Sequence, residues 1–165
     1  MELDLENIIR QEILDNFHHK YLVSKEYVNV EISDSSIIAD ITINNVDFSS
    51  GISLVSGSRF TLSQAGAYNL EFSAQFDKTN SSNSTAYIWL RKNGADVADT
   101  NTSITLGGGA NDRAVAAWNF YVSASANDYY ELMWSTDNAQ IQMDYQAAGV
   151  HPAIPSVILT VNQVA

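Results

Sequence analysis

The sequence contains no cysteine among its 165 residues. Disulfide bonds, thiolate metal sites and cysteine nucleophiles are therefore excluded. Secreted domains of this size often depend on disulfides for stability. The absence of cysteine consequently favours a protein that is assembled inside a cell.

Positive charge is also scarce, because 8 Lys and Arg residues face 19 Asp and Glu residues, for a formal net charge of −11. Such a charge repels phosphates and anionic lipids, so we expect neither nucleic acid nor a membrane surface as a partner. No apolar run approaches the roughly 18 residues of a transmembrane helix. The N-terminus, MELDLENIIRQEILDN, lacks the basic and apolar regions of a signal peptide. We expect a soluble protein made in the cytoplasm.

Catalytic motifs are missing as well. The sequence has three histidines, and no H-E-x-x-H, G-x-S-x-G, Walker or dinucleotide-binding pattern occurs. His18 and His19 follow a predicted helix, where positive charge stabilises the helix dipole. His151 lies in a Gly-Val-His-Pro turn and is expected to be a surface residue. We therefore expect no enzyme and no cofactor.

Carboxylates are numerous, and paired carboxylates can cleave glycosides, while loop carboxylates can bind calcium. The aspartates of the later part of the chain lie near turns or strand ends, where an aspartate usually accepts hydrogen bonds from the local backbone. They are Asp96, Asp99, Asp112, Asp128, Asp137 and Asp144. We expect no catalytic residue and no metal site, although a calcium site in these loops stays open.

What the sequence does contain begins with an amphipathic helix. Leu5, Ile9, Ile13 and Phe17 recur every four residues, and Asp4 is suited to cap the first turn. A helix of about four turns is marginal alone in water, so its apolar stripe must pack on something. The sandwich, a second copy of the chain and another protein are the three alternatives.

From Tyr27 onward the period changes to two, which is typical of β-strands. The clearest strand runs from Tyr68 to Phe76, and a long one from Ala114 to Val122 carries Trp118 on its apolar face. Asn93-Gly94 is a strong signal for a type I′ hairpin turn. Short strand candidates recur about 8–15 residues apart, which indicates an all-β sandwich or barrel.

The order of these signals from about residue 46 to residue 164 resembles the C1q/TNF-like jelly roll. The resemblance rests on the Gly66-x-Tyr68 strand entry, the hairpin ending at Asn93-Gly94, the two strands that follow it, and the final strand, 154–161. It implies an all-β, antiparallel jelly-roll sandwich, preceded by a short N-terminal α-helical arm. We place the arm at residues 1–45 and the jelly roll at residues 46–165.

The resemblance also implies a homotrimer and a candidate interface. In the family, the strands matching 68–76, 114–122 and 155–161 lie in one sheet. The residues expected on the outer face of that sheet are largely apolar, whereas an exposed sheet face should be polar. They are Val115, Ala117, Tyr121 and Ile158. We expect another subunit to cover them, the alternative being the helical arm.

Cysteine-free members rich in Ser, Thr and Asn resemble bacteriophage virion proteins. The leading hypothesis is therefore a non-enzymatic capsid decoration (cement) protein, made in the host cytoplasm and located on the virion. It would bind the major capsid protein or another virion protein through its arm. The anchor candidates are Leu5, Ile9, Ile13, Phe17 and Tyr21.

Two alternatives remain open. The first is the receptor- or glycan-binding tip of a tail fibre or spike, in which aromatic side chains stack on host sugars. The candidates for this role are Tyr87, Trp89 and Tyr129, which could equally be core or subunit contacts. The second is a bacterial C1q-like domain of unrelated function.

Overall fold

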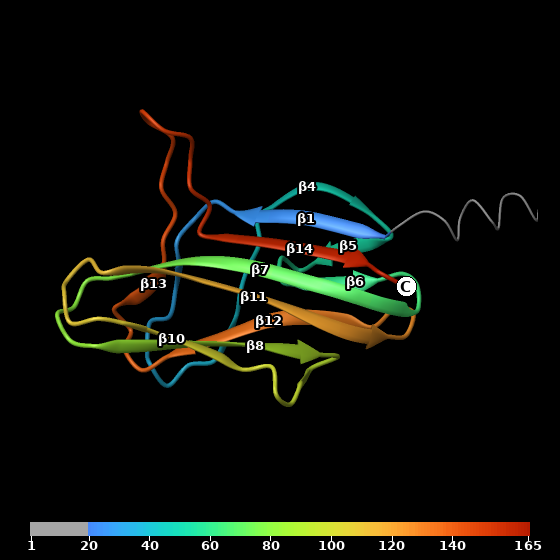
Figure 1. Cartoon of the computed structure of the whole chain (residues 1–165), viewed down its shortest axis with the longest axis horizontal. Coiled ribbons are helices and arrows are strands. Elements are labelled where there is room, and N and C mark those ends of the chain that lie inside the picture. The colour runs from blue at the N-terminus through green and yellow to red at the C-terminus, as the bar shows by residue number, and fades with distance from the viewer. Residues whose placement is uncertain (1–19) are drawn as a thin grey trace, which may run out of the picture.

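The computed structural model describes residues 20–165, which form an antiparallel sandwich of two seven-stranded β-sheets (Figure 1). The predicted all-β sandwich is thereby confirmed. The predicted helix, with Leu5, Ile9, Ile13 and Phe17, lies outside the described residues. No helix long and apolar enough to cross a membrane occurs within residues 20–165.

Each sheet draws strands from the whole length of the chain. The first sheet contains β1 (Tyr21–Glu26), β2 (Val30–Glu31), β4 (Asn45–Ser50), β7 (Gly66–Lys78), β11 (Arg113–Ala124), β13 (Ile141–Met143) and β14 (Val157–Gln163). The second sheet contains β3 (Ala39–Asp40), β5 (Ile52–Val55), β6 (Arg59–Leu62), β8 (Ser84–Lys92), β9 (Ala95–Asp96), β10 (Thr102–Leu106) and β12 (Tyr129–Thr136).

Strand β7 is the spine of the first sheet. One of its edges pairs with β11 from Gly66 to Asp77. Its other edge pairs with β14 and, further along, with β13. Because β1 joins β14 and β4 joins β1, the sheet ends at β4 on one side and at β11 on the other.

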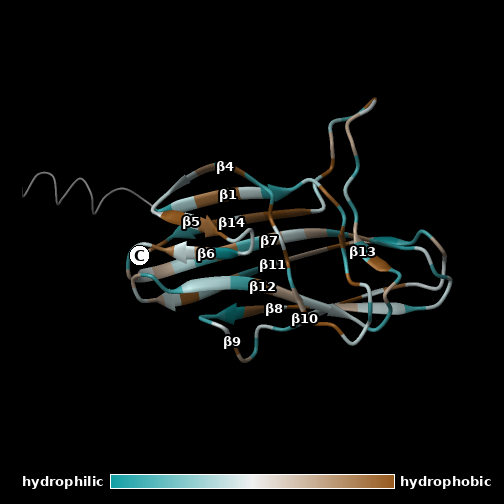
Figure 2. Ribbon diagram, turned by 180° about the vertical axis from the view of Figure 1, so that it is seen from behind, coloured by the Kyte–Doolittle hydropathy of each residue, from teal (hydrophilic) through white to brown (hydrophobic). Residues whose placement is uncertain are grey.

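The core lies between the sheets and follows the predicted alternation. In β7, the predicted inward face from Tyr68 to Phe76 is buried. Phe72 packs against Phe120, and Phe76 against Trp134, each with ring centroids 6.2 Å apart. β14 is coloured hydrophobic along most of its length (Figure 2), in keeping with its place between β7 and β1.

Residues 21–45, which we assigned to the arm from the sequence, lie in the sandwich. β1 pairs with both β14 and β4, and Leu22, Ile41 and Ile43 are buried in the core. The alternating apolar residues of this segment were visible in the sequence. Its strands β2 and β3 have only two residues each, too few to be distinguished from an extended arm.

Two local predictions had different outcomes. Asn93 and Gly94 both have positive φ (49° and 83°) and join β8 to β9, which confirms the predicted hairpin. Trp118, predicted on the core face of its strand, is 56% exposed. It does point to the same side as the buried Phe72, its register partner. Its strand is the edge of the sheet, so half of the indole extends past the core.

A hairpin between β13 and β14 projects from one end of the sandwich (Figure 1). An isolated bridge between Gln146 and Ile154 holds its base, and Val150 near its tip is 97% exposed. His151 belongs to this hairpin and is exposed, as predicted for a turn histidine. The start of β1 lies at the opposite end of the sandwich (Figure 1).

The two valines Val157 and Val150 offer a matched test of this packing. Val157 is fully buried in β14, so Val157→Ala should lower the free energy of unfolding by about 2 kcal/mol through lost burial and a residual cavity. Val150→Ala should change it by less than about 0.5 kcal/mol. Urea midpoints at one protein concentration measure both. Equal effects would contradict the described core.

Candidate functional site

The predicted interface residues and the predicted glycan residues lie on opposite outer faces of the sandwich. Val115, Ala117 and Tyr121 come from β11 in the first sheet, and Ile158 comes from β14 in the same sheet. Tyr87 and Trp89 come from β8 in the second sheet. The two sets therefore form separate surfaces.

The outer face of the first sheet combines apolar and amide side chains. Val115 is 54% and Tyr121 72% exposed, Ala117 is exposed, and Ile158 is half-buried. Ala117 and Ile158 flank the same residue of β7, Ser73, from opposite sides. The structure therefore brings these two predicted residues into one row across the sheet.

A groove of about 510 Å³ lies at the β11 side of this face. Its lining residues are Asn69, Glu71, Ala117, Trp118, Asn119 and Tyr121. Trp118 was not among the predicted interface residues, because alternation assigned it to the core. Alternation along a strand predicts which side of the sheet a residue faces, but not whether the strand lies at the edge of the sheet. The sequence therefore carried no signal that Trp118 would be exposed.

Near the opposite edge of the first sheet, β1 carries Tyr21, the one anchor candidate that the structure describes. Its ring meets Phe48 of β4 edge-on, with ring centroids 5.7 Å apart. Both side chains are partly exposed, and Tyr21 pairs with Asn162 in the sheet. Tyr21 is thus part of a strand, at the point where the described chain begins.

On the second sheet, Tyr87 and Trp89 line a cleft of about 450 Å³, which we call the aromatic cleft. Its other lining residues are Asp96, Val97, Ala98, Asp99, Asn101 and Ser135. The inward-facing residues of the same strand are Ala86, Ile88 and Leu90, all buried. Tyr87 and Trp89 therefore belong to the outer face and not to the core.

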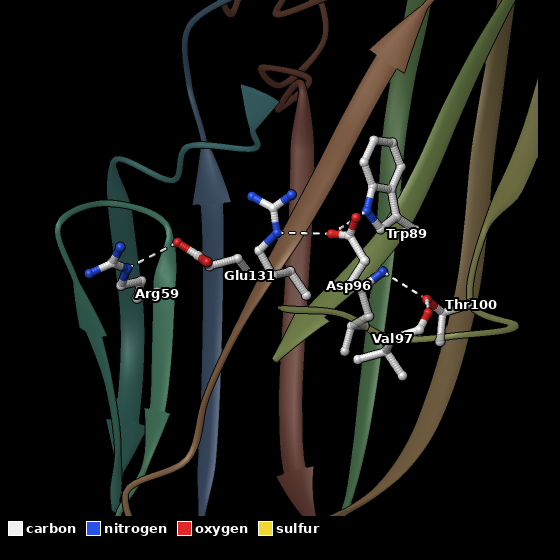
Figure 3. A network of polar contacts seen from close by, with 8 residues as sticks. Arg59, Trp89, Asp96, Val97, Thr100 and Glu131 are labelled. Carbon is white, nitrogen blue, oxygen red and sulfur yellow. Dashed lines mark hydrogen bonds and ion pairs between the residues drawn. The ribbon is translucent and has the colours of Figure 1, made fainter. Parts of the chain in front are cut away.

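Trp89 is fixed in the aromatic cleft by Asp96. The indole Nε1 and the Arg91 Nε both donate to Asp96 Oδ1, each over 2.9 Å (Figure 3). These hydrogen bonds, first from Trp89 and then from Arg91, lower the pKa of Asp96. Asp96 accordingly stays ionised and orients the ring.

The third glycan candidate, Tyr129, does not reach the aromatic cleft. Met133 lies opposite Trp89 in the sheet, and Tyr129 is four residues from Met133, about 13 Å along the strand. The guanidinium of Arg59 lies over the Tyr129 ring, 5.0 Å from its centroid. The Arg59 Nε also donates to Glu131 over 3.0 Å (Figure 3). The structure therefore separates Tyr129 from the other two.

Two turn aspartates accept hydrogen bonds from backbone N–H groups, and for Asp128 that group is the local one predicted from its position in a turn. Asp128 accepts from the Ser125 N–H over 2.8 Å and from Asn93 over 2.7 Å, and pairs with Lys92 over 2.7 Å. These contacts, that from Lys92 foremost, lower the pKa of Asp128 to about 2. Asp137 accepts from the Thr85 N–H over 2.7 Å.

Asp144 lies beside Asp77 and Arg113 at one end of the first sheet. Arg113 is 3.3 Å from Asp144 and 3.6 Å from Asp77. Burial, together with the neighbouring Asp77 charge, raises the pKa of Asp144. The two carboxylates thus have Arg113 as their counter-ion. Among residues 20–165, no three or more side chains of the kinds that bind metals lie together.

The comparisons with known proteins support the fold. No family model and no curated protein matches the sequence. Solved structures of murine APRIL at pH 8.0 and pH 8.5 are similar to this chain, with TM-scores of 0.57 and 0.53 at 11% and 13% sequence identity. Each match covers 88% of this chain and 99% of the APRIL chain. The chain has a TNF/C1q-like β-sandwich fold, and at this identity the likeness concerns the fold alone.

The low pKa of Asp128 predicts a measurable pH dependence. A carboxylate with a lowered pKa stabilises the fold above its unfolded pKa of about 3.9, and this contribution is lost as pH falls towards about 2. Asp128→Asn should therefore be less stable than the wild type at pH 6, and the difference should shrink between pH 4 and pH 2. Urea midpoints across this range measure it.

Asp99→Asn serves as the control, because the Asp99 carboxylate makes no hydrogen bond to another residue of the described part of the chain. Its stability difference from the wild type should stay small throughout. A constant difference between wild type and Asp128→Asn from pH 6 to pH 2.5 would contradict the assignment.

Proposed function

We propose that this chain is a non-enzymatic structural protein of a bacteriophage particle. In this role it forms a homotrimer through the outer face of the first sheet and decorates the capsid, attached by its N-terminal segment. The observation that carries the proposal is the exposed apolar surface around β11. The absence of cysteine and the high content of Ser, Thr and Asn favour a virion protein.

The trimer is supported by the apolar surface at β11. Trp118 extends beyond the core of its own subunit and lines one groove with Ala117 and Tyr121. In a trimer this surface would contact a different surface of the next copy, and such heterologous contacts close into rings when the rotation allows. Burial of Val115, Trp118 and Tyr121 would remove these side chains from water.

The non-enzymatic role is supported by what surrounds the carboxylates. Asp128 and Asp137 accept hydrogen bonds from neighbouring backbone N–H groups, and Asp96 holds Trp89 and Arg91. Groups committed to such contacts are poor general acids or bases, because proton transfer would break the contacts. Asp144 and Asp77 share the guanidinium of Arg113, which holds both carboxylates in ion pairs.

Attachment through the N-terminal segment is supported by where the described chain begins. Lys20 and β1 enter the sandwich at the end opposite the projecting hairpin (Figure 1). In a trimer whose axis runs along the strands, three N-terminal segments would leave from one end. Three linked segments raise the effective concentration of each contact, so each contact can be weak.

The homotrimer predicts the effect of a charge at Val115. Val115→Asp should convert the protein to monomers at micromolar concentration, because burying an unpaired carboxylate costs several kcal/mol. Val150→Asp, the same substitution at a fully exposed position, should leave the trimer intact. Light scattering coupled to size-exclusion chromatography measures both. A monomeric wild-type protein, or a trimeric Val115→Asp variant, would refute the proposed interface.

Attachment predicts the effect of removing residues 1–19. The truncation should leave a folded trimer, because it stops before β1. It should abolish binding to phage particles produced by the bacterial strain in which this gene is found. Co-sedimentation with purified particles measures binding, and circular dichroism verifies the fold. A matched variant with the N-terminal segment intact and Val150→Ala should bind normally. Unimpaired particle binding by the truncated protein would end this model.

A further inference from the structure

We propose that the aromatic cleft on the second sheet binds a neutral pyranose sugar. This inference goes beyond the proposed structural role and does not depend on it. The cleft lies between the outer face of β8 and the segment that links β9 to β10. Its floor is aromatic, and its rim is made of short polar side chains.

The floor has the size and chemistry of a sugar-stacking surface. Tyr87 and Trp89 are two residues apart on one face of β8, so their Cα atoms lie about 7 Å apart along the strand. Tyr87 is 37% exposed, and Trp89 is half-buried. The C–H groups on one face of a pyranose are apolar and pack on such rings, while its hydroxyl groups need polar partners around them.

The cleft is held in one shape before any ligand arrives. Its outer wall is fastened to β8 by the Val97 N–H, which donates to the Leu90 carbonyl over 2.9 Å. The Thr100 hydroxyl donates to the Val97 carbonyl over 2.7 Å and accepts from the Leu90 N–H over 3.1 Å (Figure 3). Since Asp96 also fixes the Trp89 ring, little side-chain freedom would be lost on binding.

The rim offers unused hydrogen-bonding groups. The hydrogen bonds that hold the cleft together, within residues 20–165, do not involve three of its polar side chains. These are Asp99, Asn101 and Ser135. Asp99 also has a left-handed backbone (φ 61°), a conformation that aspartate tolerates. A carboxylate, an amide and a hydroxyl around an aromatic floor supply the acceptors and donors that sugar hydroxyls require.

The charge of the cleft selects neutral sugars over acidic ones. Two of its lining residues are aspartates, and none of them is a cation. Arg91 is committed to Asp96, and the chain as a whole carries a net charge of −11. A sialic acid or uronic acid carboxylate would therefore be repelled.

The cleft would also remain open in the proposed trimer. Its strands belong to the second sheet, whereas the proposed interface uses the first sheet and β11. Three clefts per trimer would bind a dense glycan surface more tightly than one cleft binds a single sugar. Binding of one sugar should be weak, with a dissociation constant of roughly millimolar order.

The test uses the full-length protein and two kinds of probe. Fluorescently labelled protein is applied to an array of neutral oligosaccharides and their sialylated counterparts. Methyl pyranosides of the neutral sugars that bind are then titrated while tryptophan fluorescence is followed. We expect binding to neutral glycans and a fluorescence change that disappears in Trp89→Phe, since Trp118 and Trp134 lie outside the cleft.

Variants locate the site. Tyr87→Ala and Asn101→Ala should each weaken binding about tenfold or more, the loss expected when a stacking ring or a polar partner is removed. Tyr27→Ala, which changes a half-buried tyrosine directly after β1 of the first sheet, should bind as the wild type does. Circular dichroism of each variant verifies folding, and Trp89→Phe keeps the aromatic ring.

Three results would overturn the proposal: no binding to any neutral glycan, binding to sialylated glycans only, or unchanged binding by Tyr87→Ala together with a fluorescence change that persists in Trp89→Phe. The oligomeric state is measured in the same samples. A monomer that binds neutral sugars would refute the proposed trimer and leave this inference standing.

Discussion

The structure depends on the hydrogen bonding of one long strand, β7, along both of its edges. β11 occupies one edge from Gly66 to Asp77, and β14 and β13 share the other. Because both edges of β7 are already paired and β11 pairs with no other strand of the sheet, β11 is an open edge of the first sheet, as β4 is at the other side. An unpaired edge of this length is a surface that proteins usually cover or blunt. The exposed Trp118 and Tyr121 lie on this strand.

The sequence was most informative where one physical rule acts over several neighbouring residues. Alternation from Tyr68 to Phe76 predicted β7 with its buried face, and Asn93-Gly94 predicted the hairpin, because two positive φ angles suit that pair. It was least informative for residues 21–50. β2 and β3 have two residues each and pair with strands far away in the sequence, and β4 is largely exposed, so local alternation does not show that these segments join the sandwich.

The candidate surfaces were predictable only in part, for a related reason. Parity along a strand gives the side of the sheet, so Val115 and Tyr121 were placed on the outer face correctly. Distances across strands depend on register, and the register of β12 against β8 puts Tyr129 far from Trp89. The loop that forms one wall of the aromatic cleft is held by hydrogen bonds of the Thr100 side chain, and no sequence pattern predicts these bonds.

The outer face of the second sheet and the β11 edge of the first sheet differ in the surroundings of their aromatic side chains, and this difference separates two kinds of partner. Trp89 has its N–H bonded to Asp96 and its ring framed by polar residues, an arrangement stable in water that can accept a small polar ligand. Trp118 and Val115 expose half of their surfaces at an edge strand, where only a large apolar partner would remove the cost of hydration. A sandwich with both arrangements can assemble through one sheet while the other stays open to recognise a ligand.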